Sequence, residues 1–227
     1  MFVTISKKSI IIVLLIVLIA SFLFALPSIS TSIPSNKITI VIDAGHGGID
    51  GGTVGDITGI TERELNLVYA KKLENLCKEA NFNIVMTRNN LNGLYDTFSD
   101  NKKKDDMLKR EQIINKAKPD LVISLHMNSF PLQSSRGAQC FFKEDNAQSI
   151  YLANKIQECL LANLPFAREF ALKGDYYILN CNNYPSVIVE CGYLSNREEE
   201  QLLLQEEYQD KVVYSIFQGI LKYFSGI

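Results

Sequence analysis

The stretch Ile38-Thr39-Ile40-Val41-Ile42-Asp43-Ala44-Gly45-His46-Gly47-Gly48-Ile49-Asp50-Gly51-Gly52 decides the fold of this chain. Its first half is apolar and β-branched, which is typical of a buried strand in a parallel sheet. The run ends in Asp43 and then breaks into glycines that surround His46. Because open α/β sheets bind ligands beyond the carboxyl ends of their strands, the stretch predicts a strand over residues 37–43 and a loop that carries a site residue.

The rest of the chain alternates strand-like and helix-like segments, which indicates an α/β fold. We expect further strands at 82–87, 121–126, 137–143, 175–180 and 186–191, and helices at 62–80, 106–116, 147–164 and 197–223. The first helix has Thr61 as its N-cap and Glu64 at its third position, the pattern of a capping box. The sequence therefore predicts a mostly parallel or mixed sheet sandwiched by helices, with segments 137–143 and 175–180 as the candidates for antiparallel pairing.

The N-terminal segment differs in composition from the rest. Residues 10–26 are apolar and uncharged, follow Lys7-Lys8, and precede a Ser/Pro-rich stretch at 27–36. The positive-inside rule keeps the basic flank in the cytoplasm, so the remainder is exported. The length of the run leaves a cleaved signal peptide and a retained membrane anchor both open. We expect a leader and tether at residues 1–36 and one catalytic domain at 37–227, secreted or anchored on the outer face of the membrane.

Composition argues against two classes of function. The formal net charge of -2 and the absence of a basic tract disfavour nucleic acid as a partner, because phosphate binding needs clustered Lys and Arg. The five cysteines include no C-x-x-C pair, so neither a zinc-thiolate knuckle nor a redox motif is indicated. We interpret most of the cysteines as small apolar core residues.

Polar residues that suit metal chemistry stand at the ends of three predicted strands. The chain has only two histidines, His46 and His126, and Glu190 closes the apolar run Val187-Ile188-Val189. Glu62 enters at the start of the first helix, with Glu64 as a near alternative. Two imidazoles and one carboxylate, with a fourth position open for water, form a ligand set of catalytic zinc. A second carboxylate beside that water can move its proton, so the pattern predicts a hydrolase.

Four segments together resemble one known family. They are Ile42-Asp43-Ala44-Gly45-His46-Gly47-Gly48, Glu62-Arg63-Glu64-Leu65-Asn66-Leu67, Ser124-Leu125-His126-Met127-Asn128-Ser129 and Val189-Glu190-Cys191-Gly192-Tyr193-Leu194-Ser195-Asn196. In order and spacing they are similar to the zinc-dependent N-acetylmuramoyl-L-alanine amidases (amidase type 3 family), which trim peptidoglycan. The resemblance covers residue 37 to the C-terminus.

The resemblance implies a fold similar to zinc carboxypeptidases and a set of residue roles. It implies that Zn2+ is held by His46, Glu62 and His126, and that Glu190 is catalytic. It favours Glu62 over Glu64, which already suits the cap. Because the chain is short, exported and without wall-binding repeats, it is most similar to the spore-cortex and germination-specific branch, where removal of the peptide allows muramic δ-lactam to form. Asp43 either orients His46 through its second nitrogen or caps the buried turn.

Three alternatives remain at this point. A zinc carboxypeptidase acting on stem peptides would share the metal chemistry, and a non-catalytic wall-binding protein would not need all four site residues. A cysteine nucleophile at Cys191 is disfavoured, because alternation along a strand points it away from Glu190.

Division amidases of the family that the chain resembles can carry an inserted helix that occludes the site. About ten residues join His126 to the next strand here, too few for such a helix and its connections. We also hypothesise that an accessory exported protein localises the enzyme or orders the glycine-rich loop before Glu62, since such loops are entropically costly to order.

Overall fold

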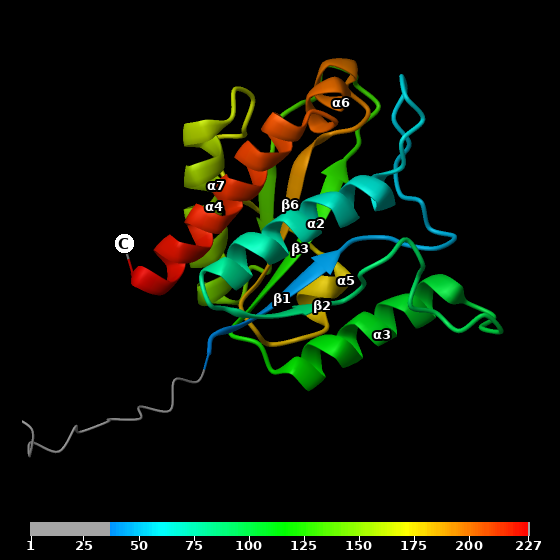
Figure 1. Cartoon of the computed structure of the whole chain (residues 1–227), viewed down its shortest axis with the longest axis vertical. Coiled ribbons are helices and arrows are strands. Elements are labelled where there is room, and N and C mark those ends of the chain that lie inside the picture. Colours follow the sequence, from blue (N-terminus) through cyan, green and yellow to red (C-terminus); the bar gives the residue numbers. More distant parts are fainter. Residues whose placement is uncertain (1–36, 227) are drawn as a thin grey trace, which may run out of the picture. The chain divides into compact units, whose positions relative to one another are not determined.

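The computed structural model describes residues 37–226, so the predicted leader and tether lie outside the described residues. Within this range the chain forms one six-stranded sheet with helices on both faces (Figure 1). The strands are β1 (Thr39–Ala44), β2 (Asn83–Met86), β3 (Leu121–Asn128), β4 (Gln139–Phe142), β5 (Leu172–Lys173) and β6 (Ser186–Tyr193). The helices are α2 (Glu62–Glu79), α3 (Lys102–Ala117), α4 (Ala147–Asn163), α5 (Tyr177–Asn180), α6 (Arg197–Leu203) and α7 (Glu206–Ser225).

The strand order β2-β1-β3-β6-β4-β5 places β1, β3 and β6 side by side at the centre of the sheet. These three strands run parallel, and β4 is antiparallel to β6. The expected α/β fold with a mostly parallel, mixed sheet is therefore confirmed. Since parallel strands end at the same edge, the residues after β1 and at the ends of β3 and β6 are brought together.

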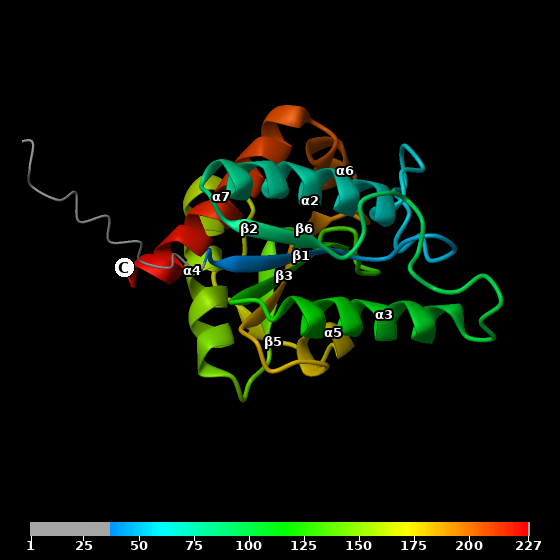
Figure 2. The same cartoon turned by 60° about the horizontal axis from the view of Figure 1, so that its bottom comes forward.

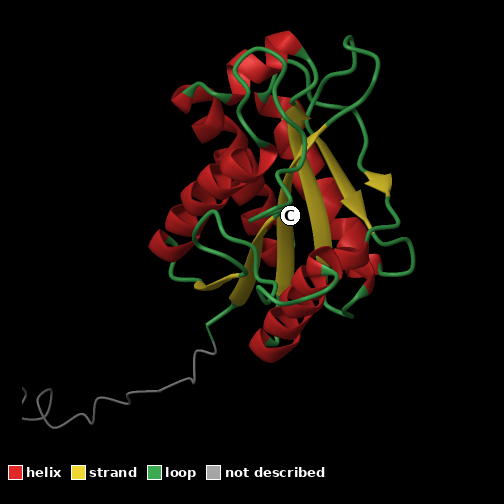
Figure 3. Ribbon diagram, turned by 90° about the vertical axis from the view of Figure 1, so that its right-hand side faces the viewer, coloured by secondary structure: helices red, strands yellow, loops and turns green. Residues whose placement is uncertain are grey.

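Alternation along the central strands divides the core into two layers. Ile40 and Ile42 of β1 face the larger layer, which is covered by α2, α4 and α7, whereas Val41 faces the smaller layer under α3 and α5. Figure 2 shows α2 on one side of the sheet and α3 with α5 on the other, and Figure 3 shows the strands between two groups of helices. His126 and Glu190 fall on the α3 and α5 face, because the residues that flank them in sequence pack into the larger layer.

The segment 175–180 was expected to be a strand, and this prediction is wrong: it contains α5, and the short strand β5 precedes it. Ile178 and Leu179 both bury in the smaller layer, which a helical turn permits and a strand does not, because neighbouring side chains in a strand face opposite ways. Two boundaries also differ from those expected. Helix α3 begins at Lys102, capped by the Asn101 side chain, and the C-terminal helical region is divided into α6 and α7.

Three further findings concern the described part of the chain. None of its helices is long and apolar enough to cross a membrane. All five cysteines are free thiols, and four of them are buried, as expected of apolar core residues. The segment 129–138 between β3 and β4 contains no helix, in agreement with its shortness.

Candidate metal centre

Three side chains from distant parts of the sequence converge beyond the carboxyl ends of β1 and β3. His46 Nε2 lies 3.1 Å from Glu62 Oε1, and His126 Nδ1 lies 2.9 Å from the same oxygen. One donor atom from each residue fits within 4.8 Å of the other two. The structure thus brings together the three residues that the family resemblance implied as metal ligands.

Glu62 is held in place by the backbone around it. It is 3% exposed, and its two carboxylate oxygens accept hydrogen bonds from the amides of Thr53 at 2.9 Å and Met127 at 3.2 Å. The buried Asn66 side chain donates to it as well. Burial alone would raise the pKa of Glu62, but hydrogen bonds and positive charge from the two histidines outweigh it and hold the pKa well below its usual range. Glu64 instead bonds the N-cap of α2, so the structure separates the two candidate carboxylates.

The backbone that carries His46 is clamped by two buried arginines. His46 has a φ of 62°, a left-handed conformation that is uncommon for a residue other than glycine. Arg88 donates to the carbonyls of Ala44 and Gly45, both at 2.8 Å, and Arg110 donates to those of Ala44 and His46. Three consecutive carbonyls are therefore fixed by guanidinium groups, which holds the backbone from which the His46 imidazole projects.

The carboxylate that faces the second nitrogen of His46 is Asp50, not Asp43. Asp43 accepts hydrogen bonds from Thr87 and Ser124, both at 2.6 Å, and pairs with the buried Arg110 guanidinium. These partners hold the pKa of Asp43 at about 2 although burial alone would raise it. A short backbone bridge between Gly47 and Asp50 folds the loop back, so that Asp50 Oδ1 lies 3.0 Å from His46 Nδ1. The interpretation in which Asp43 orients His46 directly is corrected accordingly.

Glu190 stands directly opposite His126 in the β3–β6 register. It is 9% exposed, and its Oε2 has no hydrogen-bond partner among the described residues. Burial raises the pKa of Glu190 to about 7, although the two histidines act in the other direction. The neighbouring Cys191 packs into the core on the other face of the sheet, and burial raises the pKa of its thiol well above the usual value. A thiolate nucleophile at Cys191 is therefore not supported.

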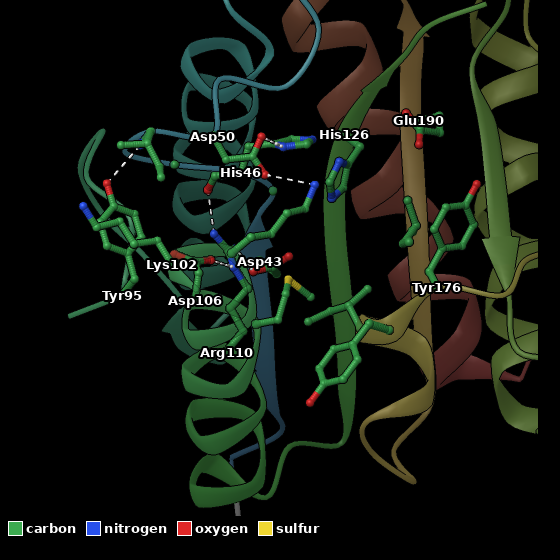
Figure 4. A pocket seen from close by; sticks show the side chains of 18 residues that line it. Asp43, His46, Asp50, Tyr95, Lys102, Asp106, Arg110, His126, Tyr176 and Glu190 are labelled. Atoms are coloured by element: carbon green, nitrogen blue, oxygen red, sulfur yellow. Dashed lines mark hydrogen bonds and ion pairs between the residues drawn. The ribbon is translucent and has the colours of Figure 1, made fainter. Parts of the chain in front are cut away.

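A cavity of about 400 Å³ opens beside these residues. Figure 4 shows His46, His126 and Glu190 around it, with Tyr95 and Lys102 to one side and Tyr176 to the other. The volume lies within the ~300–1,000 Å³ range of ligand sites. Two nitrogen donors and one carboxylate oxygen, with an unpaired buried carboxylate nearby, fit the donor set of a catalytic zinc ion. The arrangement suits hydrolysis of a substrate that enters this cavity.

Glycine at position 45 is required for this geometry. A Cβ at Gly45 would lie 2.2 Å from the His126 ring, so only glycine lets the imidazole approach the end of β1. The last residue of the fourth family-like segment, Asn196, has a structural role. It caps α6, because its side chain accepts hydrogen bonds from the amides of Glu198 and Glu199.

Comparison with known proteins shows the family of this chain. Residues 40–222 match the family model described as N-acetylmuramoyl-L-alanine amidase. The chain belongs to this family. It is 35% identical to the germination-specific N-acetylmuramoyl-L-alanine amidase of Bacillus subtilis over 199 residues, covering 86% of this chain and 83% of that protein.

Solved structures of amidases share the fold. The CwlD amidase of Clostridioides difficile, in complex with the GerS lipoprotein, matches with a TM-score of 0.80 and 34% identity over 84% of this chain and all of that one. The catalytic domain of the CwlV amidase from Bacillus (Paenibacillus) polymyxa var. colistinus matches with a TM-score of 0.72 and 28% identity, over 83% and 98% of the two chains. The chain is thus an N-acetylmuramoyl-L-alanine amidase that acts on peptidoglycan.

Proposed function

We propose that this amidase works with Zn2+ held by His46, Glu62 and His126, and that Glu190 moves the proton. The observation that carries the proposal is the buried, unpaired Glu190 carboxylate, which lines the same cavity as His46 and His126, two of the three residues whose donor atoms converge. The bond cleaved is the amide between N-acetylmuramic acid and L-alanine. When bound, zinc supplies a Lewis acid that polarises the amide carbonyl and makes water acidic.

The residues of the chain supply the remaining steps. Glu62 and the two imidazoles present their donor atoms to one point, with Glu62 fixed by backbone amides and His46 by its clamped loop. Glu190 takes a proton from the attacking water and then gives it to the nitrogen of L-alanine, so that the amine leaves neutral. A buried carboxyl with an oxygen free of hydrogen bonds suits both halves of this transfer.

The variant Glu190→Gln tests this assignment. It keeps the shape of the side chain but removes the base, so it should bind zinc like the wild type and release peptide at least ~100-fold more slowly. Glu158→Gln, which changes an exposed carboxylate on α4, serves as the control and should leave the rate unchanged. Retained activity in Glu190→Gln contradicts the role of Glu190.

The products separate the amidase from the alternative, a zinc carboxypeptidase that shortens the stem peptide. Mass spectrometry of digested muropeptides should show free lactyl-muramic acid together with intact peptides. Peptides shortened at their carboxyl ends, with the muramyl amide intact, would favour the carboxypeptidase.

We further propose that the enzyme acts in the spore cortex, where loss of the peptide precedes muramic δ-lactam formation. The similarity to a germination-specific amidase supports this setting. Export by the predicted leader at residues 1–36, either cleaved or retained as a membrane anchor through residues 10–26, would deliver the domain to the wall. A strain lacking the protein should form cortex without δ-lactam, and normal δ-lactam content would contradict the proposal.

An accessory exported partner is the last part of the proposal. The similar CwlD amidase was solved with a lipoprotein, which supports a partner for this chain too. The loop before Glu62 already has contacts of its own, since Glu200 accepts from the amides of Ile57 and Thr58. If a partner orders this loop, the isolated protein should bind zinc weakly and the complex tightly. Stoichiometric zinc in the isolated protein would count against the hypothesis.

A further inference from the structure

The wall of the active-site cavity that faces away from β6 is formed by the first turn of α3. Lys102 and Lys103 of this turn line the same cavity as His46 and Glu190. Lys102 lies over the Tyr95 ring, with its ammonium 5.7 Å from the ring centroid. Tyr95 is itself anchored, because its hydroxyl accepts a hydrogen bond from the Ile49 amide at 2.9 Å. The side chain of Lys102 is therefore guided along a fixed surface of the cavity.

The protein supplies few carboxylates to pair with the positive charges of Lys102 and Lys103. The acids below it, Asp43 and Asp106, are paired with Arg110. Within residues 37–226, Lys102 has no ion pair, and Lys103 has only Asp50, at 3.6 Å and with the lysine side chain 75% exposed. The N-terminus of α3 adds the positive end of a helix dipole. The wall is thus suited to an anion of the substrate.

The carboxylate of Asp50 lies between Lys103 and His46, one of the proposed metal ligands. Asp50 approaches His46 Nδ1 at 3.0 Å with one oxygen and the Lys103 ammonium at 3.6 Å with the other. An extended peptide advances ~3.3–3.6 Å per residue, so a carboxylate on the residue after L-alanine lies about 7 Å from the scissile amide. The Lys103 ammonium is thus separated from a proposed metal ligand by one carboxylate side chain. The peptide is the half of the substrate that carries carboxylates, whereas the glycan half is neutral around the lactyl group.

We propose that Lys102 and Lys103 form the subsite for the stem peptide and bind the free carboxylate of the acidic residue that follows L-alanine. The subsite rests on the proposed amidase reaction and adds to it a preference for peptides with that carboxylate free. The glycan then leaves the metal centre on the side away from α3. A single charge-assisted contact of this kind corresponds to a preference of about tenfold or more.

Two muramyl peptides that differ in one group test the subsite. One carries the free carboxylate after L-alanine and the other carries a carboxamide. The wild type should show a kcat/KM about tenfold or more higher for the carboxylate substrate, and added salt should reduce the difference. The double variant Lys102→Met/Lys103→Met should lose the preference through a higher KM for the carboxylate substrate alone. Lys104→Met, one residue further along the exposed start of α3, should retain it.

The outcomes separate this subsite from other roles of the lysines. A wild type that cleaves both substrates equally overturns it, and so does an equal loss of activity on both substrates in the double variant. Lower zinc content in Lys103→Met would also overturn it, since the lysine would then act through Asp50. A wild type that releases peptide from neither substrate contradicts the amidase assignment instead, so the two failures are distinguishable.

Discussion

Replacement of Arg110 by methionine should unfold the protein more easily and weaken zinc binding together. Arg110 is buried, pairs with Asp43 and Asp106, and donates to the carbonyls of Ala44 and His46. Methionine fills part of the volume but leaves two buried carboxylates without their cation. Breaking one side of a buried ion pair costs roughly 3–5 kcal/mol. In a domain of this size, that corresponds to a fall in Tm of roughly 10 °C.

Chemical denaturation of the metal-free protein gives the stability change, and competition with a chelator gives the zinc affinity. Arg110→Lys is the matched variant, because it keeps the charge but lacks the planar fork that reaches Asp43, Asp106 and two carbonyls. It should recover part of the stability while the zinc affinity stays low, since the backbone of His46 is no longer clamped.

A double-mutant cycle decides whether the Asp43–Arg110 pair is responsible. Asp43→Asn combined with Arg110→Met should cost at least about 2 kcal/mol less than the sum of the single changes, because the second change removes the charge that the first leaves unpaired. Additive effects, within about 0.5 kcal/mol, would refute the reasoning. If Arg110→Met loses the expected stability but keeps its zinc affinity, Arg110 does not clamp the backbone of His46.

Three further predictions concern the same end of the sheet. Folding lowers the pKa of Asp43 from 3.8 to about 2, so the contribution of its ionised form to the free energy of unfolding is fully present above pH ~4 and is lost as the pH falls toward 2. Urea unfolding across this range should show that the free energy of unfolding falls more steeply in the wild type than in Asp43→Asn. Asp50→Asn should weaken zinc binding by ~10–100-fold with little change in metal-free stability, and unchanged affinity would show that Asp50 does not orient the imidazole. Gly52→Ala should reduce zinc affinity, because the new Cβ would lie 2.4 Å from Glu62 Oε2. Gly59 has a similar positive φ but nothing within 4 Å of an added Cβ, so Gly59→Ala should lose stability without losing zinc affinity. An equal loss of zinc affinity in both variants would point to backbone strain instead.

Local sequence patterns were enough to predict the central part of the fold. The β-branched run of β1 and the glycines after it are properties of neighbouring residues, and the capping box of α2 lies within four positions. Burial on both faces makes such strands continuous in their hydrophobicity, so they are readily recognised. The segment that became α5 has similar apolar residues, but its conformation depends on packing against α3, which no local pattern records.

The sequence by itself predicted an amidase with His46 after β1, His126 in β3, Glu62 at the start of α2 and Glu190 in β6. Only the tertiary structure decided which side chains meet. Asp43 pairs with Arg110 across 67 positions because α3 covers that face of the sheet, and Asp50 reaches His46 because the glycine loop folds back on itself. The choice of partner depends on the face to which a side chain points and on what covers it, and both are consequences of long-range packing.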